Sequence, residues 1–455
     1  MKILIVGAGL VGSNLAEELS REGHDISIVD RDPKRISAIA DSLDVLTVRG
    51  NACLPSVLIQ AGIKSMEMVI AVTERDEVNM MVCFLASKFN VANRFARLKN
   101  MEFSTATQVF PPSELFIDQA INPGEIIITT VLKILKTPGV VNAAEFADGE
   151  ILLREFDVPE TAPLAGKSIE ALSGVSAMDS FLVVAIVRDG KLMIPKFEDT
   201  IMVGDKIYTV VDKEFLPFLL PMLNKTVDEI QKIVIFGATP VSAHLAQALE
   251  STTKDLSLIE PSLEKANKAA EMLSRCVVHN GSGTDMKLFN EIGMADADFF
   301  LALSDDDEAN ILSALLAKKK GASRTLVISH ARDYLPILDS IGIDVTINPR
   351  LITVSAILKN LRKGQVISVF KLMEDAEVME ILVDSDSSII GQSITKLKFP
   401  DKAKIGAIVR QGEMRLPDQD LVIEAGDTFI LVVLPDAIDK IEKLFGRKRR
   451  FLPFR

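Results

Sequence analysis

The sequence has few of the side chains on which disulfides and metal centres depend. Its 455 residues include only three cysteines. Cys53, Cys83 and Cys276 lie far apart in the sequence, without the spacing of metal ligands. Their odd number favours free thiols in a reducing compartment, so the expected location is the cytoplasm. We expect no metal site.

Positive charge and long apolar runs are also scarce. The chain has 51 basic against 63 acidic residues, a net charge of −12, which argues against a nucleic-acid partner that needs a broad positive surface. Nowhere does it offer the roughly 20 consecutive apolar residues of a membrane helix. Residues 1–22 show no basic leader before a long apolar run. We therefore expect a protein that neither spans a membrane nor is secreted.

One segment departs from this acidic composition. Residues 447–455 combine five positive charges with two aromatic side chains. Such a segment suits anionic headgroups or a membrane partner. It also suits a solvated, frayed terminus, which is the interpretation we favour.

The chain contains the same pattern of residues twice. A short apolar run at 2–6 precedes Gly-Ala-Gly-Leu-Val-Gly at 7–12, and Asp30 closes the next apolar run. The order returns 230 residues later, with Gly-Ala-Thr-Pro-Val-Ser at 237–242 and Glu260. Further repeated segments are 76–79 with 307–310, 121–123 with 347–349, and 185–188 with 407–410. The chain is therefore a tandem duplication.

Each repeat, of about 220 residues, is long enough for two small domains. Strand-length apolar runs recur in its first part, at 2–6, 25–29, 45–48, 68–72 and 93–98. Strands alternating with helical segments predict a doubly wound parallel sheet of the Rossmann type, an α/β fold. The expected divisions are a Rossmann domain 1–123, a crossover helix and linker 124–140, a small α+β domain 141–227, a Rossmann domain 228–350, a crossover helix and linker 351–366, and a small domain 367–455 with the basic segment.

The small domains lack a glycine motif and are expected to be rich in β-structure. In the first, the predicted strands are 150–156, 182–188 and 205–211, with a hairpin turn at 187–191. The same order recurs at 407–433. A linker helix is expected within 217–231, and a helix over 125–136 that stops at Thr-Pro-Gly in 137–139.

The first glycine motif has the residue types that hold a pyrophosphate. Gly7 permits a tight strand-to-helix turn, Gly9 lets the backbone approach the phosphates, and Gly12 allows close packing of the helix. Ala8, Leu10 and Val11 complete this turn, and the helix expected at 10–22 directs free N–H groups toward the phosphates.

An acid follows at the position expected for a ribose ligand. Asp30 can accept ribose hydroxyl hydrogen bonds and would repel a 2′-phosphate, which favours NAD over NADP, although Arg31 weakens the discrimination. The alternative is a helix-capping or surface acid.

Other candidates lie where further strands end, because a doubly wound sheet binds ligands at its carboxyl edge. Asn51, with Ala52, is suited to an adenine edge. Thr73 and Ser304 end corresponding strands in the two repeats, and each is either a hydroxyl ligand or a helix N-cap.

The second copy has lost glycines. Thr239 and Ser242 replace Gly9 and Gly12, which places a β-branched side chain where the pyrophosphate should approach. Gly237, Ala238 and Glu260 remain. A weakened nucleotide site and an empty structural copy both fit this pattern.

The duplicated motif leaves an enzyme as the alternative function, namely an NAD-dependent oxidoreductase. Histidine, the usual acid–base group of such enzymes, occurs four times, always within the two Rossmann copies and never in a small domain. The residues are His24, His244, His279 and His330. The lack of an acid or base in the small domains argues against a dehydrogenase.

The whole pattern resembles the RCK (regulator of potassium conductance) family. The resemblance rests on the glycine motif and Asp30, on 71–73 with 76–80, on 93–97, and on the second-half segments 306–318 and 406–410. It implies two RCK N domains, each followed by an RCK C domain, in a homo-oligomeric ring, with a dimer of dimers as one form. The implied partner is a Trk-type potassium-translocating membrane subunit, with the ring peripheral on the inner face of the cell membrane.

The resemblance also implies NAD(H) or ATP/ADP as ligand and a regulatory role without catalysis. By position, Gly7 to Val11 would hold phosphate, Asp30 ribose, Thr73 and Glu74 the far wall, and Arg97 a phosphate. Arg97 otherwise reads as a solvated charge at a strand end. The helices after the two Asn-Pro pairs are the expected levers between Rossmann and small domains.

Overall fold

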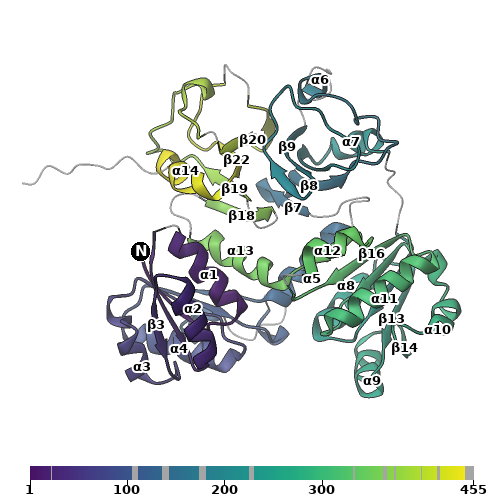
Figure 1. The fold of residues 1–455 in the computed structure, drawn as a ribbon, viewed down its shortest axis with the longest axis horizontal. Coiled ribbons are helices and arrows are strands. Elements are labelled where there is room, and N and C mark those ends of the chain that lie inside the picture. The colour runs from purple at the N-terminus through teal and green to yellow at the C-terminus, as the bar shows by residue number, and fades with distance from the viewer. Residues whose placement is uncertain are drawn as a thin grey trace, which may run out of the picture. The chain divides into compact units, whose positions relative to one another are not determined.

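The computed structural model describes residues 1–21, 23–104, 111–135, 143–173, 181–224, 230–331, 334–361, 366–372, 376–400, 402–417 and 421–445. They form two six-stranded and two five-stranded sheets (Figure 1). Three expected features lie wholly or partly outside the described residues: the breaker at 137–139, the later part of the linker helix at 225–229, and the basic segment 447–455. Within the described ranges, none of the helices combines the length and apolar character required to cross a bilayer.

The first Rossmann sheet confirms the predicted doubly wound topology. Its strands are β1 (Lys2–Val6), β2 (Asp25–Asp30), β3 (Leu46–Arg49), β4 (Met68–Ala71), β5 (Asn93–Arg97) and β6 (Gln119–Ile121). The helices are α1 (Leu10–Arg21), α2 (Pro33–Ser42), α3 (Pro55–Gln60), α4 (Asp76–Lys88) and α5 (Pro123–Leu135). The strands lie parallel in the order β3-β2-β1-β4-β5-β6. The order reverses between β1 and β4, where such sheets bind their ligands.

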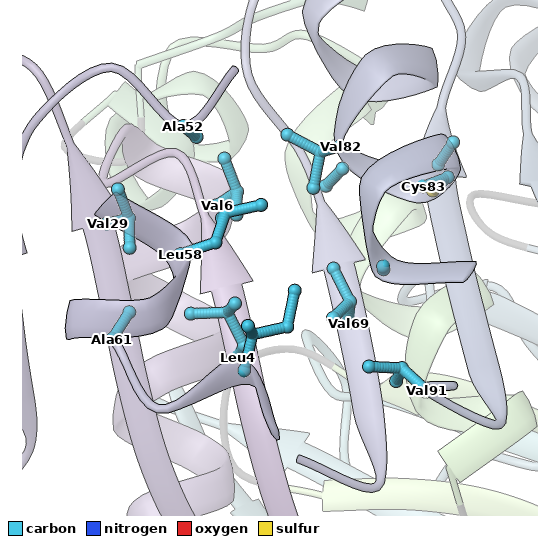
Figure 2. Packing of buried hydrophobic residues seen from close by; sticks show 14 of the residues in the cluster. Leu4, Val6, Val29, Ala52, Leu58, Ala61, Val69, Val82, Cys83 and Val91 are labelled. Carbon is cyan, nitrogen blue, oxygen red and sulfur yellow. The ribbon is translucent and has the colours of Figure 1, made fainter. Parts of the chain in front are cut away.

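Burial on both faces explains why the strands are continuous apolar runs. Every residue of β1 after Lys2 is buried, as is all of β4. Figure 2 shows one of the two faces, where Leu4, Val6 and Val69 lie with Leu58 of α3 and Val82 of α4. A sheet covered by helices on both faces has no solvent-facing side chains, so the polar positions fall at the strand ends.

The second half repeats the first. Its strands are β12 (Lys232–Phe236), β13 (Asp255–Glu260), β14 (Val277–Asn280), β15 (Phe299–Ala302), β16 (Arg324–Ile328) and β17 (Val345–Ile347). The helices are α8 (Pro240–Leu249), α9 (Leu263–Met272), α10 (Met286–Glu291), α11 (Asp307–Lys320), α12 (Leu335–Ser340) and α13 (Pro349–Leu361). The strand order, β14-β13-β12-β15-β16-β17, is that of the first sheet.

The two small modules are antiparallel, as their turn-rich sequences predict. The first contains β7 (Ala143–Phe146), β8 (Ile151–Asp157), β9 (Phe181–Arg188), β10 (Lys191–Met193), β11 (Lys206–Asp212), α6 (Ile169–Ser173) and α7 (Leu216–Met222). The second contains β18 (Val366–Leu372), β19 (Ala376–Leu382), β20 (Ala403–Arg410), β21 (Glu413–Arg415), β22 (Thr428–Val433) and α14 (Ile438–Phe445). The strand orders are β10-β9-β11-β8-β7 and β18-β19-β22-β20-β21.

The hairpin predicted at 187–191 is confirmed. Asp189 and Gly190 have φ angles of 52° and 73°, which two-residue turns of the right twist require. Arg188, at the start of this turn, is partly exposed and paired with a buried carboxylate. Its Nε and Nη2 donate hydrogen bonds of 2.8 and 2.7 Å to Asp205, a carboxylate that is only 1% exposed. The Arg188 side chain is held at the hairpin by this pair, because a buried carboxylate is stable only with a charged hydrogen-bond donor.

The described residues cluster into two compact units. One comprises 1–129, 232–334 and 347–357, and the other comprises 130–231, 335–346 and 358–455. The second unit therefore joins the two small modules. They share one hydrophobic core, to which Val184 and Val210 contribute from the first module and Ala407 and Val432 from the second.

A glycine permits this close approach of the two small modules. A Cβ at Gly406 would lie 2.9 Å from a methyl group of Val184 and 3.2 Å from one of Val210. Both contacts are closer than carbon atoms normally come. The sequence predicted two separate β-rich modules and did not predict this shared core.

Lys404 places a charge between the two small modules. Its Nζ donates a 2.7 Å hydrogen bond to the carbonyl oxygen of Pro195. Burial lowers the pKa of Lys404 to about 8, an effect that the charge of Asp199 opposes. The protonated form is therefore penalised in the folded protein, because lysine in an unfolded chain titrates near 10.4.

This burial predicts a pH-dependent stability difference between the native protein and Lys404→Met. The penalty of the buried ammonium is fully present below about pH 8 and is relieved as the pH rises toward 10.5. Relative to the variant, the native protein should gain roughly 2–3 kcal/mol over that interval, at about 1.4 kcal/mol for each pKa unit. Urea unfolding of both proteins across this range measures the gain, and a constant difference would contradict it. The thiols of Cys83 and Cys276, whose pKa burial raises to about 12, titrate alike in both proteins.

Candidate functional site

The first glycine turn brings the start of α1 against the end of β1. Gly7 has a φ of 107°, which glycine adopts without strain, and a Cβ there would lie 3.0 Å from the backbone nitrogen of Thr73. A Cβ at Gly12 would lie 1.8 Å from the carbonyl oxygen of Gly7. These two glycines are therefore required by the turn itself, whether or not a ligand binds.

The turn leaves several backbone donors available. Within the described part of the chain, no hydrogen-bond acceptor is found for the N–H groups of Gly9, Leu10, Val11 and Gly12. The first intrahelical bond runs from the N–H of Ser13 to the carbonyl of Gly9, at 2.8 Å. Four N–H groups at a helix N-terminus, with the positive end of the helix dipole, form a site for a phosphate.

Asp30 braces this turn. Its Oδ2 accepts a 2.6 Å hydrogen bond from the N–H of Ala8, and its Oδ1 accepts one of 2.8 Å from the N–H of Asp32. The N-cap of α2 is Asp32, so the helix-capping interpretation of Asp30 is wrong. A carboxylate oxygen has about two lone-pair sites, so Asp30 can hold the turn and still accept ribose hydroxyls.

Asn51 and Ala52 follow β3. Asn51 is exposed, and its Oδ1 accepts a 3.1 Å hydrogen bond from the N–H of Cys53. Ala52 is buried at 6% exposure in the core beneath. The acceptor of Asn51 is thus used by the turn, and the NH₂ group is the part suited to a base edge.

The opposite wall of the site carries the charged groups. Arg97 is 8% exposed, and its Nη1 donates a 3.1 Å hydrogen bond to Glu74, which also contacts Lys99. Burial opposes ionisation of Glu74, but the hydrogen bond from Lys99 and the charges of Arg97 and Lys99 outweigh it and lower the pKa of Glu74. The interpretation of Arg97 as a solvated charge is therefore wrong, because its side chain is nearly buried and is paired with Glu74.

A buried asparagine, which the sequence analysis did not select as a site residue, sets the position of Thr73. Asn79 of α4 is fully buried. Its Oδ1 accepts hydrogen bonds from the N–H and hydroxyl of Thr73, and its Nδ2 donates to the carbonyls of Thr73 and Arg97. Asn310 makes the same four bonds to Ser304 and Ile328 in the second half. The repeated Asp-Glu-x-Asn sequence was the available signal.

The helix N-cap interpretation of the strand-end hydroxyls is wrong. The N-cap of α4 is Arg75 and that of α11 is Asp306. Thr73 and Ser304 each lie two residues earlier, where their hydroxyls bond to the buried asparagines instead. The asparagine thus anchors the loop between strand and helix, and the hydroxyl is part of that anchor.

The second turn keeps an acid that accepts hydrogen bonds from the turn, but side chains occupy the N–H groups at its helix N-terminus. Glu260 accepts hydrogen bonds from the N–H of Ala238 at 2.7 Å and of Ser262 at 2.8 Å, as Asp30 does in the first half. Thr239, however, caps α8 through a capping box with Ser242. The N–H groups of both residues are bonded to each other's hydroxyls, at 2.8 and 3.2 Å. Since Pro240 has no N–H, three of the four donors free in the first turn are lost here.

Parallel pairing brings the candidate residues of each half together. Val6 pairs with Val29 and Ala71, and Ala71 with Ala96, so these strands end at one edge. The first-half candidates at this edge are Gly7, Ala8, Gly9, Leu10, Val11, Gly12, Asp30, Asn51, Ala52, Thr73, Glu74 and Arg97. Those of the second half are Gly237, Ala238, Thr239, Glu260 and Ser304. Their role as ligands stays a prediction. The described residues contain no group of three or more side chains placed to hold a metal ion.

Comparison with known proteins relates the whole chain to one family. The TrkA-N domain model matches residues 3–123 and 233–349, and the TrkA-C domain model matches 153–214 and 378–446. The Trk system potassium uptake protein TrkA of Azorhizobium caulinodans is 35% identical, with 98% of each chain covered. The protein of the same name from Vibrio alginolyticus is 32% identical, with 99% of this chain and 100% of its own length covered.

Solved structures agree with this fold. The GsuK RCK domain has a TM-score of 0.60 at 16% identity, covering 98% of this chain and 94% of its own. A GsuK channel bound to NAD has a TM-score of 0.60 at 17% identity, covering 98% and 78%. The duplicated glycine turn, the tandem arrangement of sheets and these matches lead to one conclusion. The chain belongs to the TrkA family, and its TrkA-N and TrkA-C domains each occur twice.

Proposed function

We propose that this chain is a nucleotide-sensing regulatory subunit for potassium uptake, without catalytic activity of its own. It binds NAD(H), or ATP and ADP, at the first glycine turn and acts on a Trk-type potassium-translocating membrane subunit. It does so as a homo-oligomeric ring, a dimer of dimers, at the cytoplasmic face of the membrane. The names of the relatives support a role in potassium uptake, and the geometry of the first turn supports a nucleotide as the ligand.

The observation that carries the proposal is the open N-terminus of α1 beside a braced carboxylate. The free N–H groups at 9–12 suit the pyrophosphate, and Asp30 suits the adenosine ribose. Both groups lie where the strand order of the sheet reverses, as in the dinucleotide-binding arrangement. An acid at position 30 disfavours a 2′-phosphate, so NAD(H) rather than NADP(H) is the dinucleotide.

The second half is proposed as a structural copy. Its helix N-terminus is satisfied by Thr239 and Ser242, both buried. A pyrophosphate there would have to displace these hydroxyls and would then find few free N–H groups. One nucleotide site per chain is therefore expected.

Regulation requires that the ligand bind two conformations of the assembly unequally. We propose α5 and α13 as the elements that transmit the difference, because each leaves its Rossmann sheet directly after an Asn-Pro pair. We propose the domain boundaries near residues 123, 140, 227, 350 and 366, so that α5 and α13 connect each Rossmann domain to the small domain that follows it.

Calorimetric titration of the full chain with NADH, NAD, ATP and ADP tests the proposal. We expect saturable binding of at least one nucleotide, with one site per chain. Gly9→Ala should lower its affinity by at least about tenfold, because a methyl group would stand where the phosphate approaches the backbone. The methyl would meet only the end of the Arg35 side chain, at 3.5 Å, so the variant should fold normally.

Two results would contradict the proposal. One is the absence of binding by all four nucleotides. The other is steady oxidation of NADH with a small carbonyl substrate, which would favour the oxidoreductase alternative. Asp30→Ala is the less informative variant, since Asp30 also holds the N–H groups of Ala8 and Asp32 and its loss would disturb the turn itself.

A further inference from the structure

The first small module contains a buried arginine within its five-stranded sheet. Arg154 of β8 is 2% exposed, and its Nη1 donates hydrogen bonds of 2.7 and 2.9 Å to the carbonyl oxygens of Ala144 and Leu153. Among the described residues, no acceptor is found for its Nε. Burial lowers the pKa of Arg154 to about 10, an effect that the charge of Glu145 opposes. The guanidinium is therefore fixed in place while one of its buried donors is unsatisfied, which is costly.

The second small module shows that this position does not require a charge. β8 and β19 are equivalent strands of the repeat, with Ala143 opposite Arg154 and Val369 opposite Met379. Met379 is fully buried in the hydrophobic core of its module. Since an apolar residue fills the equivalent position, the sheet can form without an arginine there. The cost of Arg154 in the first module therefore favours a role beyond packing.

One carboxylate lies between Arg154 and the crossover helix. Oε2 of Glu145, in β7, is 2.9 Å from Nζ of Lys133, in α5, and its Oε1 is 3.9 Å from Nη2 of Arg154. The first distance is that of a charge-assisted hydrogen bond, and the second is too long for one. The side chain of Lys133 is 29% exposed and that of Arg154 only 3%, so water can replace the carboxylate at the lysine but not at the arginine. The lysine thus holds the carboxylate that the arginine needs more.

The elements that carry these side chains allow the carboxylate to change partner. Among the described strands, β7 lies at the edge of its sheet and pairs with β8 alone. Lys133 lies in the part of α5 that clusters with the small modules, whereas the helix begins in the unit of the Rossmann domains. A movement of about 1 Å would bring Glu145 within hydrogen-bond distance of Arg154. A displacement of the end of α5 can therefore change the cation with which Glu145 pairs.

We propose that Lys133 and Arg154 compete for Glu145, so that these three residues form a two-state contact between α5 and the first small module. In one state, Glu145 pairs with Lys133 and ties β7 to the crossover helix. In the other state, it pairs with Arg154 and releases the helix. The inference rests on the proposed function, because it names the contact through which α5 transmits nucleotide binding. If nucleotide binding favours one pair, linkage requires each pair to alter nucleotide affinity in return.

Calorimetric titration of the full-length chain and its variants with NADH and ATP tests this contact. Lys133→Met removes one state and Arg154→Met the other, so they should shift nucleotide affinity in opposite directions, each by about fivefold. In a chain that also carries Glu145→Gln, the two substitutions should no longer differ in their effect. Lys213→Met is the matched control, because it breaks an exposed ion pair with Glu150 in the same module. It should leave the affinity within about twofold of the native value.

The outcomes separate this inference from the proposed function. If the native chain binds no nucleotide, both fail. If it binds and the two variants shift the affinity in the same direction or not at all, only the two-state contact is refuted, because a loss of stability would affect both alike. If Arg154→Met does not fold, Lys133→Met decides the question. A shift that persists in the Glu145→Gln chain refutes the contact, and a shift that disappears there supports it.

Discussion

Gly12→Ala should lower the free energy of unfolding by roughly 3 kcal/mol or more, with loss of the first Rossmann fold as the extreme result. The added Cβ would lie 1.8 Å from the carbonyl oxygen of Gly7 and 3.0 Å from its carbonyl carbon. Both are backbone atoms of the turn, so no side-chain rotation relieves the contact. The helix would have to move away from the sheet, against the buried side chains of Val11 and Leu15. Urea unfolding followed by circular dichroism measures the loss.

Gly9→Ala is the matched control for this prediction. It adds the same methyl group three residues earlier, where only a flexible arginine side chain lies within 4 Å. Its stability should stay within about 0.5 kcal/mol of the native protein while its nucleotide affinity falls. Equal stability of the two variants would contradict the steric argument and would indicate that α1 can shift without cost.

The second large effect is expected for Asn79→Ala. Removing the amide leaves the buried carbonyl of Arg97 without its partner, and it leaves the N–H and carbonyl of Thr73, which are partly buried, without theirs. Each unsatisfied buried group costs about 1–3 kcal/mol, so we expect a loss of about 3 kcal/mol or more in the free energy of unfolding. The loop that carries Glu74 also loses its anchor. Nucleotide affinity should therefore fall together with stability.

Asn310→Ala separates these two consequences. The four hydrogen bonds of Asn310 match those of Asn79, so a similar loss of stability is expected. Its effect on nucleotide affinity should be small if the second site is a structural copy. Thermal unfolding and calorimetric titration of both variants provide the comparison. Equal losses of affinity would contradict the assignment of one ligand site to the first half.

Much of the fold could be predicted from local patterns. The apolar runs at 2–6 and 25–29 became β1 and β2 within one residue, because a strand buried on both faces needs an uninterrupted apolar sequence. The strand predicted at 45–48 was found one residue later, at Leu46–Arg49, where only Val48 is buried. Its weak burial explains the shift, since an edge strand has a less regular apolar pattern.

The site was predictable where a residue type is required by backbone geometry. Glycines at 7 and 12 and an acid at 30 follow from the turn, and the structure gives each a backbone contact that accounts for it. Asn79 was not predicted as a site residue, although its Asp-Glu-x-Asn segment repeats. Its role depends on the loop after β4 and on the last residue of β5, which only the assembled sheet brings within reach of one amide.

By itself, the sequence determined the duplication, the alternation of strands and helices, and the weakened second motif, since each depends on residues close together in the chain. Only the tertiary structure decided whether each helix N-terminus is free to bind a ligand and how the small modules pack together. The hydroxyls of Thr239 and Ser242 close the second helix N-terminus, and the core around Gly406 joins the two small modules. These interactions join residues up to hundreds of positions apart, and their energies depend on burial and distance, which no local pattern specifies.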